Sequence, residues 1–293
     1  MNIFVLGATG LIGSQVTAQL LARGHSVTGL CRSSASCAKL QQVGAQVCRG
    51  DLRQPEGWAD RAIASDVVLQ IAATFDEEMA QVDFLAMEAL RRAAKRRGQA
   101  TRCIYTGGVW LYGDTGGDVV DETSAFSPIP EFSWMLETAN VLAADDWMDL
   151  AVLHPGLVYD SNARGMFHRF DAQIQHRQPV EIWGSAETLW PLVHVEDLAM
   201  AYVLLCENRD LSGHFNAVTE VGVAVKDIVL ALSTRREVPY RTHVVPRSEA
   251  LAKYGSSEGP MLSQRVSGRR LKDLGWTPRY DDFRKALAPI IGA

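Results

Sequence analysis

Three glycines near the amino terminus constrain the fold of this chain more than any other feature. The first thirteen residues read MNIFVLGATGLIG, in which an apolar run leads into Gly7, Gly10 and Gly13. An apolar segment with helical spacing, residues 11–21, follows directly. This order of strand, tight turn and helix start is typical of a dinucleotide site. Gly7 permits the turn, Gly10 lets the backbone approach a pyrophosphate, and Gly13 lets the helix pack on the strand.

The phosphates of a dinucleotide would bind unpaired N–H groups at the helix N-terminus, which also carries partial positive charge. The alternative is a tight turn between strand and helix with no ligand, although both neighbours that the motif requires are present. The predicted phosphate-binding residues are Gly7, Thr9, Gly10, Leu11, Ile12 and Gly13.

Composition excludes several other classes of function. The 293 residues carry a net charge of −5, which argues against a nucleic-acid partner or an anionic membrane surface. Met1 leads directly into the first predicted strand and no apolar run approaches about 18 residues, so we predict a cytoplasmic protein with no signal peptide. Five cysteines without CxxC or zinc spacing predict reduced thiols. The basic cluster at residues 91–97 is expected to be a solvated helix end.

The order of apolar segments predicts an α/β fold, a Rossmann-type doubly wound parallel sheet with a small C-terminal substrate lobe. We expect a cofactor-binding core over residues 1–160 and a lobe mainly over residues 161–293, with some segments returning to the core. That lobe is expected to consist mostly of loops and short helices. Strands are predicted at residues 27–30, 45–47, 67–71, 102–105 and 150–153, and helices at 35–43, 78–97 and 134–144.

The end of the second predicted strand indicates which dinucleotide binds. An acidic residue there normally holds the ribose 2′-hydroxyl of NAD. Here Cys31 takes that place, followed by Arg32 and Ser33. A guanidinium and hydroxyl groups would bind a 2′-phosphate that a carboxylate would repel. We therefore predict NADP rather than NAD, the alternative being that Arg32 only stacks on the adenine.

Several motifs along the chain resemble the extended and atypical short-chain dehydrogenases/reductases, which include the NAD(P)-dependent epimerase/dehydratase proteins. The resemblance implies that Asp51 and Leu52 bind the adenine and that Ala72 and Ala73 line the ribose. It also implies that Pro155, Gly156 and Leu157 flank the nicotinamide. The motifs are GATGLIG from Gly7, GDL from Gly50, AA at Ala72, YTGGVWLYG from Tyr105, HPGLVY from His154, PLVHVEDLA from Pro191 and LGWTP from Leu274.

The catalytic pair usual in these enzymes is missing from the sequence. They use a tyrosine whose pKa is lowered by a lysine four residues later, with a serine or threonine nearby. None of the seven tyrosines has a lysine at that spacing, and no lysine lies between Lys95 and Lys226. A substrate oxygen would therefore need another proton partner.

Three residues are candidates for that role. Thr106 follows a central strand, and its alternative role is to bond a backbone group in the turn. Tyr112 lies on the same predicted loop, and its alternative is packing with a bond to the backbone. Glu137 falls on the helix that would carry tyrosine and lysine; it could titrate near neutrality if desolvated, or lie solvated on the helix surface.

The histidines and tryptophans have weaker interpretations. His154 and His194 are interpreted as structural, whereas His168 begins the second lobe and could face substrate. No metal site is predicted, because no histidines or carboxylates have ligand spacing. Core packing is the default role of the tryptophans, although together they would suit an aromatic or hydrophobic substrate. They are Trp110, Trp134, Trp183 and Trp190.

Three functions remain open at this point. The first is an NADP-dependent oxidoreductase acting on a small, hydrophobic or aromatic carbonyl or alcohol. The second is a non-redox isomerase, lyase or cyclase on the same fold, and the third is an NADP-sensing regulatory protein. The missing pair favours the last two, whereas the varied residues near the predicted cleft favour an enzyme. The partner is a small-molecule substrate, and a homodimer is left open.

Overall fold

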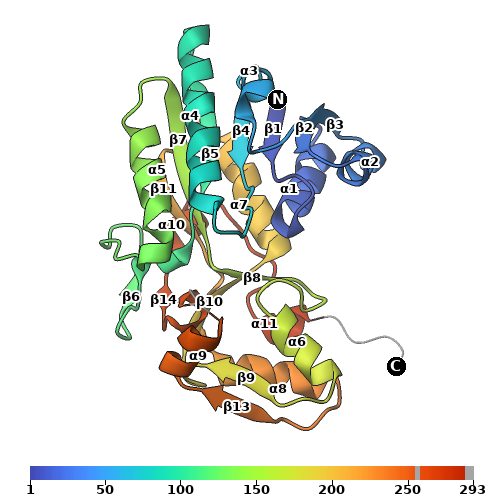
Figure 1. The fold of residues 1–293 in the computed structure, drawn as a ribbon, viewed down its shortest axis with the longest axis vertical. Helices are drawn as coiled ribbons and strands as arrows, with labels where there is room; N and C mark the ends of the chain where they lie inside the picture. The colour runs from blue at the N-terminus through green and yellow to red at the C-terminus, as the bar shows by residue number, and fades with distance from the viewer. Residues whose placement is uncertain (255–257, 288–293) are drawn as a thin grey trace. The chain divides into compact units, whose positions relative to one another are not determined.

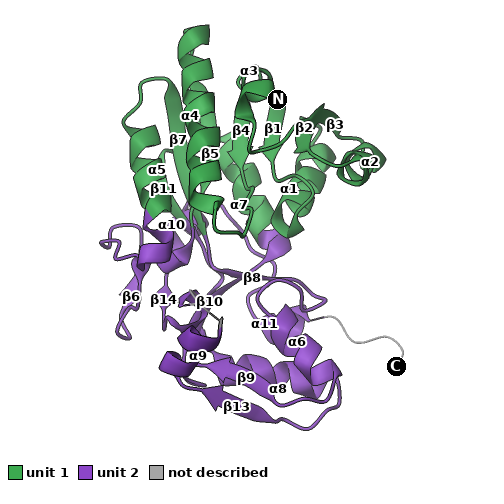
Figure 2. Ribbon diagram, viewed as in Figure 1, with its two compact units in different colours: residues 1–107, 134–154, 198–215 green, residues 108–133, 155–197, 216–293 purple. Residues whose placement is uncertain are grey.

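A computed structural model describes residues 1–254 and 258–287, in which strands and helices alternate through the first half of the chain (Figure 1). The chain divides into two compact units, each assembled from separate stretches of sequence (Figure 2). Unit 1 comprises residues 1–107, 134–154 and 198–215, and unit 2 comprises residues 108–133, 155–197 and 216–293.

Within the described residues, seven strands form the sheet of unit 1, in the order β11-β7-β5-β4-β1-β2-β3. The pairs from β3 to β7 are all parallel. Strand order reverses at β1, which is the topology of a doubly wound sheet, so the predicted fold class is confirmed. The strands span Asn2–Leu6 (β1), Ser26–Cys31 (β2), Gln46–Arg49 (β3), Val67–Gln70 (β4), Thr101–Thr106 (β5), Met148–Pro155 (β7) and Gly213–Ala217 (β11).

The central strands β1 and β4 are buried and mainly apolar on both faces, as expected where helices cover both faces of a sheet. All four residues of β4 are buried, and Phe4, Val68 and Cys103 share one core cluster with Leu90. All the strands and helices predicted over residues 1–153 are present, with bounds that differ by a residue or two. The helices on the sheet are Leu11–Ala22 (α1), Ser34–Gln42 (α2), Ala59–Ala62 (α3), Met79–Arg97 (α4), Ser133–Ala143 (α5) and Val195–Glu207 (α7), with the 3₁₀ turn Pro55–Gly57 (η1) before α3.

The basic cluster at the end of α4 is a solvated helix end, as predicted. Lys95, Arg96 and Arg97 occupy the last turn, where positive charge complements the helix dipole. Gly98 then ends the helix in the left-handed conformation, with φ 71°. Arg96 is exposed and forms an ion pair with Asp60 at 2.6 Å. The helix end and this ion pair therefore account for the positive charge of the cluster without a bound phosphate polymer.

Unit 2 has more regular structure than the sequence suggested. We expected loops and short helices, yet helix α8 has eleven residues and the strands form sheets β12-β10-β8, β13-β9 and β14-β6. The expectation failed because these strands are short and separated by turns, so their periodicity is weak. The elements are Val109–Tyr112 (η2), Val119–Val120 (β6), Pro130–Phe132 (η3), Leu157–Tyr159 (β8), His168–Gln175 (α6), Val180–Trp183 (β9), Leu189–His194 (β10), Glu220–Ala224 (β12), Val225–Arg235 (α8), Thr242–Val245 (β13), Arg247–Tyr254 (α9), Gly259–Met261 (η4), Arg265–Val266 (β14), Arg269–Asp273 (α10) and Phe283–Ala286 (α11).

Two of the motifs quoted above meet inside unit 2. The buried Asp197 accepts hydrogen bonds from the backbone N–H groups of Arg279 and Tyr280, at 2.7 and 2.8 Å. Its own carbonyl accepts the indole N–H of Trp276 at 2.8 Å. The carboxylate therefore holds the segment that follows the LGWTP motif, which agrees with a structural role for the VHVED segment.

Candidate functional site

The glycine loop after β1 brings backbone atoms unusually close together. Gly7 has φ +85°, and a Cβ on it would lie 2.8 Å from the Cα of Ala72. A Cβ on Gly13 would collide with the carbonyl oxygen of Gly7. Gly10 closes the turn by donating its N–H to Gly7 at 3.0 Å. Gly7 and Gly13 are thus required by the packing of β1, α1 and β4, as the motif predicts, whereas a Cβ on Gly10 would meet only the Gly7 carbonyl oxygen at 3.4 Å.

The first turn of α1 fits a phosphate group. Gly10 is the N-cap and makes no side-chain capping hydrogen bond, and no acidic residue lies in the first turn. The N–H groups of an uncapped first turn are suitable partners for an anion. Thr9, Leu11 and Ile12 are half-buried beside them. The residues present therefore fit a dinucleotide pyrophosphate, although their role as ligands stays a prediction.

The segment after β2 presents polar groups where a ribose would bind. Arg32 is 71% exposed, and its guanidinium lies 3.9 Å from the carboxylate of Asp51. The Ser33 hydroxyl accepts the N–H of Ser36 at 3.1 Å and so caps α2. The structure thus brings together Arg32 and Asp51, which sequence analysis assigned to the ribose phosphate and to the adenine.

The prediction of five reduced thiols is wrong for two of them. Cys31 and Cys37 form a disulfide, whereas Cys48, Cys103 and Cys206 are free and buried. The sequence did not indicate the pair, because an odd number of cysteines fits free thiols. The two Cα atoms lie 5.5 Å apart only once the end of β2 and the start of α2 have folded together.

A buried polar network beneath Ala72 was not anticipated from the sequence. Gln70 ends the otherwise apolar strand β4, and its amide group bonds both the N–H and the carbonyl of Ala72, at 3.2 and 3.3 Å. The same amide donates to Asp83, whose other oxygen accepts the hydroxyl of Tyr105 at 2.7 Å. The network therefore orients the backbone that the resemblance places against the ribose, and Ala73 follows it. The polar residue inside a buried strand was the available signal.

Burial raises the pKa of Asp83 to about 6, although hydrogen bonds from Gln70 and Tyr105 oppose the shift. Desolvation penalises the charged carboxylate more than these two donors stabilise it. Burial likewise raises the pKa of Tyr105 well above its usual value, so the phenol remains a donor.

Thr106 ends β5, and its side chain is already paired. Its hydroxyl donates to the carbonyl of Gln70 and lies 2.6 Å from the hydroxyl of Tyr202. Tyr202 is fully buried on α7, and burial raises its pKa above the usual range, so it is a proton donor to Thr106. Sequence analysis missed Tyr202 because it lies 96 residues away and has no lysine partner.

The other two catalytic candidates have different environments. Tyr112 is buried in unit 2, where its hydroxyl donates to Asn216 at 3.1 Å and its ring packs on Phe126. Burial raises the pKa of Tyr112, which opposes ionisation. Glu137 is exposed on α5, so it lies solvated on the helix surface. Both remain predictions as catalytic residues.

The residues expected to flank the nicotinamide belong to unit 2. Gly156 donates its N–H to Ala217 at 2.9 Å, and a Cβ on it would lie 2.8 Å from the carbonyl oxygen of Pro191. Pro155 and Leu157 are buried on either side of it. This glycine is therefore required by close packing of the backbone within the unit.

The histidines occupy structural or solvated positions. His154 is buried and its ring stacks on that of His214, with nitrogen atoms 2.9 Å apart. His194 bonds Ser161 at 3.1 Å, and His168 is exposed at the start of α6. Among residues 1–254 and 258–287 we find no cluster of three histidine, cysteine or carboxylate side chains able to hold a metal.

Two tryptophans of unit 2 pack against another aromatic ring, and the guanidinium of Arg169 lies 4.2 Å from the ring centroid of Trp183. Trp190 is buried and stacks on Phe170, with ring centroids 5.6 Å apart. Trp110 packs on Phe132 and closely against Gly259. These contacts agree with the default interpretation of the tryptophans as packing residues.

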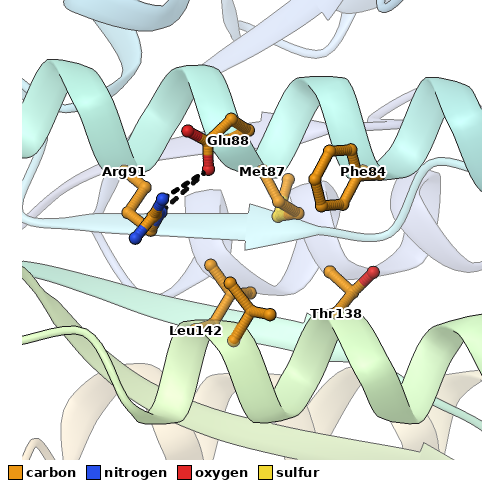
Figure 3. Close-up of a pocket in the computed structure, with 7 residues that line it drawn as sticks. Phe84, Met87, Glu88, Arg91, Thr138 and Leu142 are labelled. Carbon is orange, nitrogen blue, oxygen red and sulfur yellow. Dashed lines mark hydrogen bonds and ion pairs between the residues drawn. The ribbon is translucent and has the colours of Figure 1, made fainter.

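A small groove lies between α4 and α5, and Figure 3 shows side chains of both helices that line it. Phe84 and Val141 beside it are 45% and 42% exposed. Arg91 and Glu88 form an ion pair at its edge. No residue of the glycine loop contributes to this groove, so it is separate from the dinucleotide site. The lining residues are Phe84, Met87, Glu88, Arg91, Thr138, Val141 and Leu142.

Comparison with known proteins defines the class of this fold and site. The sequence profile of the NAD dependent epimerase/dehydratase family matches residues 3–218. The chain therefore belongs to this family, as the motifs predicted. None of the helices in the described ranges is long and apolar enough to cross a membrane.

Relatives extend the likeness over nearly the whole chain. An uncharacterized protein of Schizosaccharomyces pombe is 27% identical over 299 residues, covering 98% of both chains. UDP-glucose 4-epimerase of Thermotoga maritima, solved with UDP-glucose, gives a TM-score of 0.81 at 20% identity, covering 98% of this chain and 96% of the other. A human epimerase family protein solved with NADPH gives 0.78 at 20% identity, covering 98% and 97%. The two structures share the fold of this chain.

Proposed function

We propose that this protein is an NADP-dependent oxidoreductase that acts on a small hydrophobic or aromatic carbonyl or alcohol. The observation that carries the proposal is the segment after β2, where Arg32 and Ser33 follow a strand that pairs in parallel with β1 and does not end in an acidic residue. A guanidinium and a hydroxyl complement a 2′-phosphate. The NADPH in the related human protein supports the same choice. Residues 1–160 would hold the cofactor and residues 161–293 would mainly form the substrate lobe.

Thr106 is the best candidate for the group that meets the substrate oxygen. Its half-buried hydroxyl lies at the carboxyl end of a central strand, where doubly wound folds bind their ligands. The Tyr202 hydroxyl donates a hydrogen bond to the Thr106 hydroxyl. The Thr106 hydroxyl could therefore redirect its own proton from the Gln70 carbonyl to a substrate oxygen. Bound NADPH would supply the hydride, and the hydroxyl pair would stabilise the charge that develops on the oxygen.

The test of this function is turnover by the purified protein. NADPH oxidation would be followed by absorbance with a panel of ketones and aldehydes. UDP-glucose, with which the Thermotoga structure was solved, carries hydroxyl groups rather than a ketone or aldehyde, so it would be tested for NADP reduction instead. We expect a hydrophobic ketone or aldehyde to be reduced. Tight NADPH binding without oxidation by any compound would instead support the NADP-sensing protein or the non-redox enzyme, which the missing Tyr–Lys pair favours.

Thr106→Val is expected to lower kcat at least tenfold, because it removes the hydroxyl and keeps the shape of the side chain. Thr106→Ser is the matched control and should retain most of the activity. Tyr202→Phe should lower kcat less, since Thr106 keeps its own proton. Steady-state kinetics and thermal melts of all three variants would check this. Equal kcat in Thr106→Val and wild type would remove Thr106 from the mechanism.

Arg32→Ala is expected to weaken NADPH binding about tenfold and to change NADH binding less than twofold. The reason is that the guanidinium meets the 2′-phosphate, which NADH lacks. Arg23→Ala provides a control, because Arg23 lies at the other end of α1 and pairs with Glu207. Titration calorimetry with both nucleotides gives the result. An equal loss for NADPH and NADH would show that Arg32 serves only the adenine.

We keep the homodimer and the cytoplasmic location as proposals. The exposed apolar side chains Phe84, Leu85 and Val141 on α4 and α5 support a second copy as partner of this face. Light scattering of the purified chain would measure the mass in solution.

A further inference from the structure

A disulfide encloses the two residues that we assign to the 2′-phosphate. Cys31 is the last residue of β2, and Cys37 lies in the first turns of α2. Arg32 and Ser33 lie between them in the sequence. The covalent link therefore ties the start of α2 to the end of the strand and limits the conformations of the segment that would contact the ribose.

The other cysteines have no such opportunity to react. Cys48, Cys103 and Cys206 are buried in the unit 1 core, and burial raises the pKa of each thiol, that of Cys103 to about 12. A buried thiol with a raised pKa is a poor nucleophile. Cys37 is half-exposed. All five cysteines lie in the described residues, and among them only Cys37 combines access to solvent with a partner at disulfide distance, the buried Cys31.

We propose that Cys31 and Cys37 form a reversible redox site that sets the affinity of this chain for NADP, with the disulfide form binding more tightly. The inference rests on the proposed function, because it assumes that Arg32 and Ser33 bind the 2′-phosphate. It also rests on the proposed cytoplasmic location, because a disulfide within a protein of a reducing compartment is usually transient or regulatory.

The chemistry is thiol–disulfide exchange with a disulfide oxidant such as oxidised glutathione. The exposed Cys37 thiolate attacks one glutathione sulfur, forms a mixed disulfide and releases one glutathione thiolate. The Cys31 thiolate then attacks the Cys37 sulfur and releases the second. The two protein thiols lose two electrons and two protons, and the glutathione disulfide takes them up as two thiols. A dithiol reductant reverses both steps.

The direction of the effect follows from the geometry of the segment. Ser33 bonds Ser36 through its side chain and the N–H of Cys37 through its carbonyl, at 3.1 and 3.0 Å. Once the disulfide is reduced, the exposed start of α2 is held by non-covalent contacts, namely these bonds, the Ser33–Ser36 hydroxyl contact at 2.7 Å and the ion pair of Arg32 with Asp51. A reduced segment samples more conformations, and binding must then restrict them again. The disulfide removes that cost in advance, which is preorganisation of the phosphate site.

The experiment measures nucleotide affinity in two defined redox states. The full-length protein is equilibrated with reduced or oxidised glutathione, and mass spectrometry determines the Cys31–Cys37 bond. Calorimetry with NADPH and with 2′,5′-ADP, which carries only the adenosine end, then gives both affinities. We expect the oxidised protein to bind both ligands five- to tenfold more tightly. Cys37→Ser should bind with the weaker affinity under both conditions, and Cys48→Ala, a control at a buried thiol, should respond as wild type does.

Three outcomes would overturn the inference. Absence of the Cys31–Cys37 bond after treatment with oxidised glutathione removes the redox site. Equal affinities in the two states, or tighter binding by the reduced protein, overturn the proposed effect and leave the proposed function intact. No binding of either ligand in either state overturns the proposed function and this inference together.

Discussion

Gly13→Ala is expected to destabilise the protein by about 3 kcal/mol or more and to lower NADPH affinity at least a hundredfold. The added methyl group would collide with the carbonyl oxygen of Gly7, and its next neighbours are also backbone atoms, of Gly7 and Ala8. Overpacking in a core costs about 1–3 kcal/mol when side chains can yield, and here none can. Relief of the collision would move α1 away from β1 and so displace the N–H groups that would bind the pyrophosphate.

Gly57→Ala is the matched control for this substitution. Gly57 lies in the η1 turn of the same unit, and a Cβ on it would meet no atom within 4 Å. It should melt and bind as wild type does. Urea unfolding and calorimetric titration of both variants distinguish the two sites. A Gly13→Ala protein with normal stability and affinity would show that α1 does not pack on the turn as described.

Asp83→Asn is expected to make the protein more stable relative to wild type as pH rises. The folded pKa of Asp83 is about 6 against an ordinary value of 3.8. Below pH 3.8 the carboxyl group is protonated in both the folded and the unfolded state, so it costs nothing. Between pH 3.8 and 6 the carboxyl group is deprotonated in the unfolded state but still protonated in the folded state. Above pH 6 it is charged in both states, and the buried charge lowers the free energy of unfolding by about 3 kcal/mol.

The measurement is urea unfolding of wild type and Asp83→Asn from pH 4 to pH 7. The free energy of unfolding of wild type minus that of the variant should fall by about 2.4 kcal/mol over this range, because part of the cost is already present at pH 4. The subtraction removes contributions from other titrating groups. Tyr105→Phe should shift the window upward, since its hydroxyl lowers the pKa of Asp83. A difference that stayed constant or rose with pH would contradict the buried charge.

Local patterns predicted most of unit 1, since strands and helices there are long enough to show their periodicity. The segment MNIFVLGATGLIG contains strand, turn and helix start within thirteen residues, so its geometry is local. Prediction was poorer beyond residue 160, where a strand as short as Arg265–Val266 pairs with Val119–Val120 across 146 residues of chain. No local periodicity reports such a pairing.

The candidate catalytic group shows the same difference between what the sequence predicts and what only the folded structure shows. Thr106 could be selected from the sequence because it ends a predicted strand. Its partner Tyr202 could not, because β4, β5 and α7 must pack before that phenol reaches the Thr106 hydroxyl. Gln70 is a similar case. Its polar side chain in an apolar strand could be noticed in the sequence, but its hydrogen bonds to Ala72 and Asp83 could not be predicted from it.

The sequence by itself determined the doubly wound fold, the family and the glycine loop, because these depend on the order of residues over short stretches. It also showed that the usual tyrosine and lysine are missing. Only the tertiary structure decided which groups stand in contact, namely Thr106 with Tyr202, Gln70 with Ala72, and Cys31 with Cys37. Contacts of this kind form when the ends of separate elements pack together, and the pattern of residues along a short stretch of chain does not predict that packing.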